Sequence, residues 1–271
     1  MNEKRAKKQD EIESSNAPLI EHLTELRSRL ILSVLAFLVC MVCVFPFSKY
    51  IFNFLAMPIT ELLAGQNQAN DLIFTGLQQG FMVNVKISFF GGFIVSFPFV
   101  GFQIWRFIAP GLYKKEKLAF LPFLIASPLL FIIGAAFAYF VVLPLAFNFF
   151  LSFQNTSDLN NLVGIKYLGT INEYLSLTMR FILAFGVCFQ LPVLLTLMGK
   201  AGLVSSISLI RIRKYAIVSI LIIAAIVTPP DVITQIILFS VVYSLYEISI
   251  LLVKLVEKKK EEALQQMDEN I

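Results

Sequence analysis

Histidine, cysteine and charged residues are scarce in this chain of 271 residues, and each shortage excludes a class of protein. His22 is the only histidine, which excludes a histidine-rich metal site of the kind that hydrolases use. The three cysteines, Cys40, Cys43 and Cys188, all lie in apolar runs, so they are better explained as small apolar helix residues than as a metal or redox pair. We therefore expect no disulfide framework, no metal and no cofactor.

Other patterns are missing as well. The chain has no P-loop, no HExxH motif and no nucleophile elbow, so we expect no enzyme. Residues 1–16 are charged and polar without an apolar core, which fits neither a cleavable signal peptide nor a transit peptide. The first membrane span must then act as its own insertion signal. No repeat of 20 to 50 residues is present.

Apolar residues are abundant: they make up 58% of the chain, the mean hydropathy is +0.79, and only 15% of residues are charged. Soluble domains usually have roughly 45–50% apolar and about 25% charged residues, so lipid is the expected solvent. A spanning helix needs about 20 mostly apolar residues. The sequence predicts an all-α, polytopic membrane protein with six transmembrane helices, at about 30–47, 81–105, 118–150, 173–198, 215–228 and 232–253.

Two of these spans have unusual sequences. Pro122, Pro128 and Pro144 can kink or shorten the third. The fifth has only about 14 apolar residues before Thr228, and it is kept because a sixth run follows at once and the charges require an even number of spans. We thus expect short fifth and sixth spans.

Lysine and arginine alternate from loop to loop. Of the 22, 18 lie in the two tails and in the 106–117 and 199–214 loops, whereas two, Lys49 and Lys166, lie in the loops between. The positive-inside rule then places both termini in the cytoplasm. This topology explains the net charge of +4 without a nucleic-acid partner. We divide the chain into a polar tail (1–17), a membrane domain (18–253) and a charged tail (254–271).

The two longer outside loops, 48–80 and 151–172, differ in sequence from the spans. Apolar and polar residues mix at helical spacing around Pro58, which predicts short interfacial helices. The third outside connection is Thr228-Pro229-Pro230-Asp231, in which two prolines stiffen the turn. Asp231 is suited to cap the sixth helix.

Two cytoplasmic segments carry acidic groups beside the membrane. Residues 18–30 predict an amphipathic helix along the cytoplasmic surface that runs into the first span, with Glu25 placed to pair with Arg29. In the 106–117 loop, a Pro-Gly turn precedes Glu116, which is flanked by lysines. By themselves, these patterns also fit a salt-bridged helix start and an ion pair within the loop.

Four motifs occur in order along the chain: Pro18-Leu-Ile-x-His-Leu-x-Glu-Leu-Arg27, Phe107-Ile-Ala-Pro-Gly-Leu-Tyr-x-x-Glu116, Phe185-Gly-Val-x-Phe-Gln-x-Pro192 and Thr228-Pro-Pro-Asp231. Together they resemble the TatC family, the multi-span receptor subunits of the twin-arginine protein translocase. The resemblance extends from about residue 17 to 253.

The resemblance implies a function. TatC proteins recognise signal peptides with two adjacent arginines on folded proteins, nucleate an export complex driven by the proton gradient, and work in the bacterial inner membrane with TatA-like and TatB-like single-span subunits. Arginine binds carboxylates through a planar fork that lysine cannot copy. By similarity, the signal-binding residues are Glu25, Arg27, Phe107, Pro110, Tyr113 and Glu116. Arg27 is expected to orient Glu25 or the loop. Self-association is a further possibility.

Polar residues inside the spans need partners or water. Gln190 stands where many TatC proteins have Glu, so a mechanism that ionises this position is doubtful here. It fits interhelical contact as well as a transport role. Glu247 lies about 10 Å inside the last span, and its partner is not evident from the sequence. Lys86 and Arg180 lie near the outside ends, where long side chains can snorkel.

A secondary transporter for a small solute is the alternative function. It predicts an internal repeat and broken helices at the middle of the membrane. Prolines are present, but no duplicated half is evident.

Overall fold

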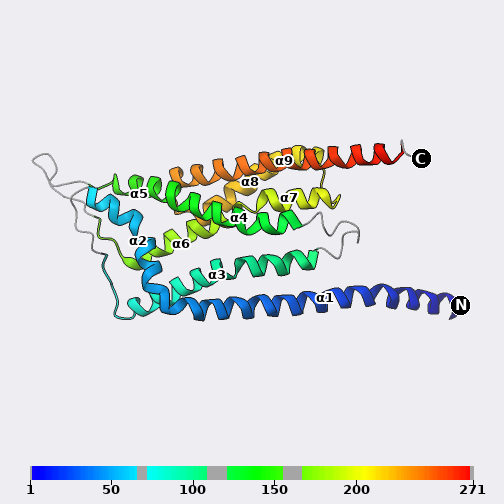
Figure 1. Ribbon diagram of the computed structural model, residues 1–271, viewed down its shortest axis with the longest axis horizontal. Coiled ribbons are helices and arrows are strands. Elements are labelled where there is room, and N and C mark those ends of the chain that lie inside the picture. The colour runs from blue at the N-terminus through cyan, green and yellow to red at the C-terminus, as the bar shows by residue number, and fades with distance from the viewer. Residues whose placement is uncertain (1, 66–71, 109–120, 155–166, 269–271) are drawn as a thin grey trace, which may run out of the picture.

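The computed structural model describes residues 2–65, 72–108, 121–154 and 167–268, and almost all of them are helical. A single parallel bridge joins Ile73 and Thr170. The described part of the chain is therefore all-α, as expected. Figure 1 shows the helices in chain order: α1 (Asn2–Val44), η1 (Phe45–Phe47), α2 (Ser48–Gly65), α3 (Gln79–Ile108), α4 (Leu121–Phe137), η4 (Ala138–Val142), α5 (Leu143–Leu151), α6 (Ile171–Cys188), α7 (Leu191–Lys200), α8 (Ser206–Val227) and α9 (Val232–Asp268).

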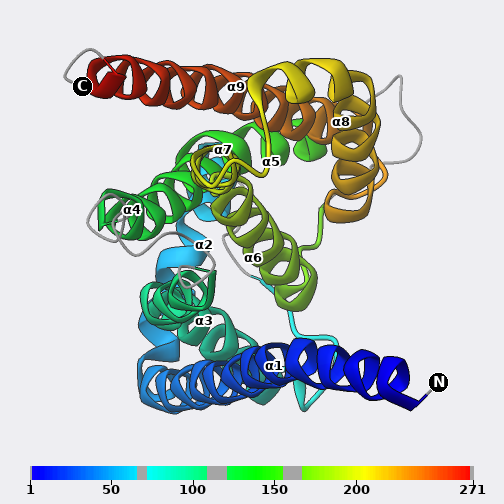
Figure 2. The same ribbon diagram turned by 90° about the vertical axis from the view of Figure 1, so that its right-hand side faces the viewer.

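The long helices run roughly side by side, and both chain termini project from the same end of the bundle (Figure 1). The last turn of α3 and the first turn of α4 also lie at this end, which we call the terminal end. Helix α2 lies at the other end, which we call the α2 end. Figure 2 shows α1 beside α3 on one side of the molecule and α8 with α9 on the other.

Five helical segments among the described residues are long and apolar enough to cross a membrane: Leu23–Gly65, Gln79–Ile104, Phe123–Leu151, Ile171–Lys200 and Val232–Glu262. Helix α8 has 22 residues but is not one of them. Every stretch of 18 residues in α8 contains Arg211, Arg213 and Lys214. Only its second half, from Tyr215, is apolar, and it covers residues 215–227 of the stretch, 215–228, that the sequence predicts as a short fifth span, so a fifth span here stays a prediction.

Prolines interrupt two of the spans in different ways. In the third, a π-helical turn, Ala138–Val142, directly precedes Pro144, which has no N–H for the carbonyl of residue 140. In the fourth, the helix breaks after Cys188 and restarts as α7 with Pro192 in its first turn. The break follows from Pro192, which has no N–H for the carbonyl of Cys188.

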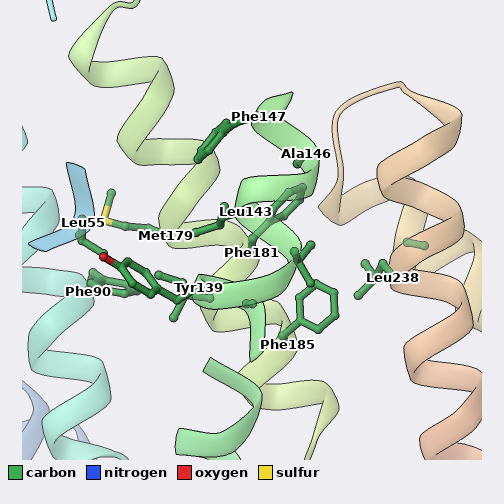
Figure 3. Close-up of a cluster of buried hydrophobic side chains, with 14 of the residues drawn as sticks. Leu55, Phe90, Tyr139, Leu143, Ala146, Phe147, Met179, Phe181, Phe185 and Leu238 are labelled. Atoms are coloured by element: carbon green, nitrogen blue, oxygen red, sulfur yellow. The ribbon is translucent and has the colours of Figure 1, made fainter. Parts of the chain in front are cut away.

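The core joins α2, α3, η4–α5 and α6 and continues to buried residues of α8 and α9, such as Ala224 and Leu238. Figure 3 shows Leu55, Phe90, Leu143 and Phe181 pointing into this cluster from four different helices. Helices α4 and α6 approach closely at Gly134, where a Cβ atom would lie 2.6 Å from the Phe185 carbonyl oxygen. This contact tolerates no side chain larger than hydrogen.

Helix α2 remains a single helix although Pro58 lies inside it. Pro58 has no N–H, so the carbonyl of Phe54 loses its helical donor. The hydroxyl of Tyr139 replaces that donor at 2.6 Å, and the hydroxyl of Tyr174 donates to the next carbonyl, that of Leu55, also at 2.6 Å. These tyrosines come from η4 and α6, so α2 is held by the third and fourth spans.

The N-terminal segment differs from the expectation. Helix α1 is one nearly straight rod, so residues 18–30 continue along the axis of the first span and do not turn along a surface (Figure 1). Helix α9 continues through Asp268, well into the predicted tail 254–271. Its Glu257 carboxylate accepts hydrogen bonds from the Ser206 backbone N–H (2.9 Å) and hydroxyl (2.5 Å), which satisfies the first turn of α8.

Candidate functional site

The Glu25 carboxylate on α1 is held from one side only. The Arg29 Nε–H donates to Glu25 Oε1 at 2.9 Å, and Arg29 Nη2 donates to the same oxygen. The predicted pairing of these residues is confirmed. The second oxygen, Oε2, accepts no hydrogen bond from any described residue. The Arg29 side chain is 17% exposed and that of Glu25 is 35% exposed, so the arginine lies against the protein while the carboxylate faces outward.

Arg29 is in turn held by α3. Its Nη1 donates to the side-chain oxygen of Gln103 at 3.3 Å, and Gln103 is buried. The two helices meet closely further along, where a Cβ atom on Gly92 would lie 2.7 Å from the Met41 Cα. Phe107, half-buried, follows Gln103 by four residues and so lies on the same face of α3 one turn nearer the terminal end.

The structure thus describes only some of the predicted signal-binding residues. The structure brings Glu25 to the α1–α3 contact that leads to Phe107. Arg27 is exposed, and no hydrogen bond or ion pair joins it to Glu25, which Arg29 orients instead. The expectation that Arg27 orients Glu25 or the loop stays a prediction, because residues 109–120 of the loop lie outside the described residues. Arg29 lies four residues from Glu25, on the same face of the helix, whereas Arg27 at two residues points elsewhere. Pro110, Tyr113 and Glu116 lie outside the described residues.

Gln190 joins two spans. The Ser127 hydroxyl on α4 donates to Gln190 Oε1 at 2.7 Å, and Gln190 Nε2 donates to the Ser127 carbonyl at 2.9 Å. Because Gln190 stands in the break between α6 and α7, its side chain can reach across to α4. An amide is suited to this reciprocal pair because it both donates and accepts.

Glu247 on α9 pairs with Arg213 on α8, whose Nη2 lies 2.7 Å from Glu247 Oε2. From the sequence alone, Arg213 is expected in a cytoplasmic loop, so it is not evident as the partner of Glu247. In the structure, residues 206–214 are helical, which carries Arg213 alongside α9. The pair neutralises both charges in an otherwise apolar stretch.

The motif residues at the α2 end, Pro58, Pro229, Pro230 and Asp231, lie in or beside structural contacts. The Asp231 carboxylate accepts from the Thr234 N–H at 2.7 Å and from the Thr234 hydroxyl at 2.5 Å, so the predicted cap of the last span is confirmed. Pro229 is half-buried and Pro230 exposed in the turn before it. Pro58 is buried in α2 beside the two tyrosine contacts described above.

Sequence reasoning missed Gln103, Ser127 and Arg213, the residues that hold Arg29, Gln190 and Glu247. Each is a polar residue in or beside an apolar run, and that is the signal that could have found them. Within the described part of the chain, no group of three or more potential metal ligands comes together.

The packed helices and their long apolar segments define the class: this chain is an integral, polytopic α-helical membrane protein. The family model described as Sec-independent protein translocase protein (TatC) matches residues 21–240. Proteins of that name from Magnetococcus marinus and Aquifex aeolicus are 46% and 42% identical to this chain; the matches cover 91% and 90% of this chain, and 87% and 98% of the relatives.

A solved structure gives the same result. A crystal structure of a twin-arginine translocase receptor, TatC, superposes with a TM-score of 0.75 at 42% identity, over 87% of this chain and 99% of that one. The chain therefore belongs to the TatC family of protein translocase components, and the resemblance found in its motifs is confirmed.

Proposed function

We propose that this protein is the receptor subunit of a twin-arginine translocase in the bacterial inner membrane. It spans the membrane six times with both termini in the cytoplasm, α8 supplying the fifth span and α2 lying at the outer interface. It binds twin-arginine signal peptides of folded proteins at the terminal end. It then assembles with TatA-like and TatB-like single-span subunits into an export complex driven by the proton gradient, and it is not an enzyme.

The observation that supports this proposal best is the carboxylate of Glu25, of which only one oxygen, Oε1, accepts hydrogen bonds from described residues. Arg29 and Gln103 fix its position, and Oε2 accepts no hydrogen bond from any described residue. A guanidinium of the signal peptide binds Oε2 while Arg29 keeps Oε1. Because the carboxylate is already oriented, little conformational entropy is lost on binding.

The remaining recognition residues complete this surface. Phe107 lies one helical turn from Gln103 and offers an aromatic face on which a guanidinium can stack. Glu116, with Pro110 and Tyr113, is proposed to receive the second arginine, and Arg27 to bind the loop or the lipid phosphates beside it. The apolar part of the signal peptide then lies along the adjacent spans.

Binding of a twin-arginine signal peptide to the purified protein tests the proposal, with the same peptide carrying Lys-Lys as reference. We expect the Arg-Arg peptide to bind more tightly, and Glu25→Gln to weaken it by about tenfold, the loss of one charge-assisted hydrogen bond. Glu61→Gln, an exposed carboxylate on α2 at the opposite end, is the matched control and should change nothing.

Equal binding of both peptides to a folded, monodisperse protein would contradict the receptor function. A secondary transporter would then be the function to test. An Arg-Arg preference that survives Glu25→Gln would leave the receptor function standing but remove Glu25 from the site.

A further inference from the structure

Two cations, Lys86 on α3 and Arg180 on α6, form no ion pair with any described residue. Lys86 on α3 donates to Asn172 Oδ1 at 2.5 Å and lies 3.4 Å from the Ser176 hydroxyl. Both partners are neutral, so the lysine charge is not compensated. Arg180 on α6 is exposed and has no hydrogen bond or ion pair with any described residue.

The two cations belong to one cluster. Asn172, Ser176 and Arg180 follow one another at intervals of four residues and therefore lie on one face of α6. Lys86 reaches the first two, so its ammonium group lies between their levels, about 9 Å along the axis from the level of Arg180. All four side chains lie in segments long and apolar enough to cross a membrane.

A carboxylate lies on the same face nearer the α2 end. Glu173 precedes Arg180 by seven residues, or two turns of helix. It is exposed and forms no ion pair with any described residue. Burial, and then the charge of Glu173, raise the pKa of the Tyr167 hydroxyl, which lies just before α6. Glu173 therefore lies close enough to Tyr167, near the start of α6, to act on it electrostatically.

The charges are ordered along α6. Counting from its first residue, Glu173 lies about 3 Å in, the Lys86 ammonium from α3 reaches the level of Asn172 and Ser176 at about 2 to 8 Å, and Arg180 lies about 14 Å in. Both helices begin at the α2 end, and helical side chains lean toward the start of their helix, so Lys86 and Arg180 reach toward that surface (Figure 1). Below them on α6, Val187 is exposed and apolar.

We propose that this cluster binds one ethanolamine phospholipid from the leaflet at the α2 end. The order of groups matches such a lipid: the ammonium outermost beside Glu173, the phosphate beneath it between Lys86 and Arg180, and the acyl chains beside Val187. Arginine forms paired hydrogen bonds with phosphate, and lysine adds a point charge. The bound phosphate supplies the counter-charge that an arginine this deep in lipid requires.

Other occupants match the cluster less well. A choline headgroup has no N–H to donate to Glu173, and a glycerol headgroup has no positive charge. A single acidic side chain from a partner helix would neutralise the cations but leave Glu173 unpaired. The inference uses only the order of residues from the bundle end, so it does not depend on the receptor function.

Native mass spectrometry of the detergent-purified protein tests the site. The protein is titrated with phosphatidylethanolamine, phosphatidylcholine or phosphatidylglycerol of identical acyl chains, and the bound copies are counted. We expect one ethanolamine lipid to bind in preference to the other two. Arg180→Gln should weaken this lipid by about tenfold, as expected for one charge-assisted hydrogen bond, and Lys86→Gln should act in the same direction.

Two further variants separate the headgroup contacts. Glu173→Gln should abolish the preference for ethanolamine over choline while retaining binding of the phosphate. Arg211→Gln, an exposed arginine on α8 near the terminal end, is the matched control and should retain wild-type lipid binding.

Three results would overturn the proposal. They are equal retention of the three lipids by the wild-type protein, tighter binding of phosphatidylglycerol than of phosphatidylethanolamine, and an ethanolamine preference that Arg180→Gln and Lys86→Gln both leave intact. The first would direct attention to a partner helix with an acidic side chain.

Discussion

In the interior of the bundle, polar side chains pair across helices, although Glu247 Oε1 and Arg213 Nε stay buried without a partner, whereas at the terminal end the partly exposed Glu25 pairs with Arg29 on its own helix. Arg213 and Glu247 neutralise each other, Gln190 exchanges two hydrogen bonds with Ser127, and tyrosine hydroxyls replace the donor that Pro58 lacks. Interior polar groups thus hold helices together, because an unpaired polar group in lipid is costly. At the terminal end, water lowers that cost, so a carboxylate is available for a partner.

This comparison predicts that interior substitutions lower stability without changing signal discrimination, and that substitutions at the terminal end do the reverse. The largest effect is expected for Glu247→Gln, which leaves Arg213 uncompensated within the apolar part of the bundle. The expected loss is about 2.5 kcal/mol, the insertion cost of an unpaired arginine. Thermal unfolding in detergent measures it.

The double variant Arg213→Gln with Glu247→Gln is the control for this pair. Removing both charges should recover most of the lost stability, since no uncompensated charge remains. If the single and double variants are equally unstable, the pair does not act as a unit.

Next in size is Tyr139→Phe, which leaves the Phe54 carbonyl without a donor. The cost of an unsatisfied buried carbonyl is about 2 kcal/mol. Tyr174→Phe is the comparison, and its effect should be smaller, because the Leu55 carbonyl can still accept from the N–H of residue 59. Thermal unfolding of the two variants side by side gives the difference, and a larger loss for Tyr174→Phe would contradict this account of Pro58.

A smaller effect is expected for Gln190→Leu. It removes both hydrogen bonds to Ser127, and contacts of this kind between membrane helices contribute about 1 kcal/mol. Twin-arginine peptide binding should remain at the wild-type level. A loss of peptide discrimination without loss of stability would place Gln190 in the transport mechanism and break the division between interior and terminal end.

The smallest stability effect is expected for Arg29→Gln, less than about 1 kcal/mol, because the pair lies on one helix and is partly exposed. Peptide affinity should nevertheless fall, since Glu25 loses the group that orients it. Arg106→Gln, at an exposed position in the last turn of α3, serves as the charge-matched control. If Arg29→Gln instead tightens binding, Arg29 competes with the signal peptide for Glu25.

The sequence by itself determined the class of the protein, its family and most of its helices. Long apolar runs specify helices because backbone groups in lipid must be satisfied within their own segment. Local spacing also fixed the Glu25–Arg29 pair, the cap at Asp231 and the break at Pro192, since each depends on residues within four positions of one another.

Only the tertiary structure decided which distant residues meet. Gln103 holds Arg29, Ser127 holds Gln190, Arg213 neutralises Glu247, and two tyrosines support Pro58. None of these contacts follows from spacing, because partners on different helices meet only after the helices have packed at a particular rotation and depth. Close approaches at Gly92 and Gly134 determine how these helices pack. The packing of α1 against α3 in turn determines the position of Glu25 Oε2, which accepts no hydrogen bond from any described residue.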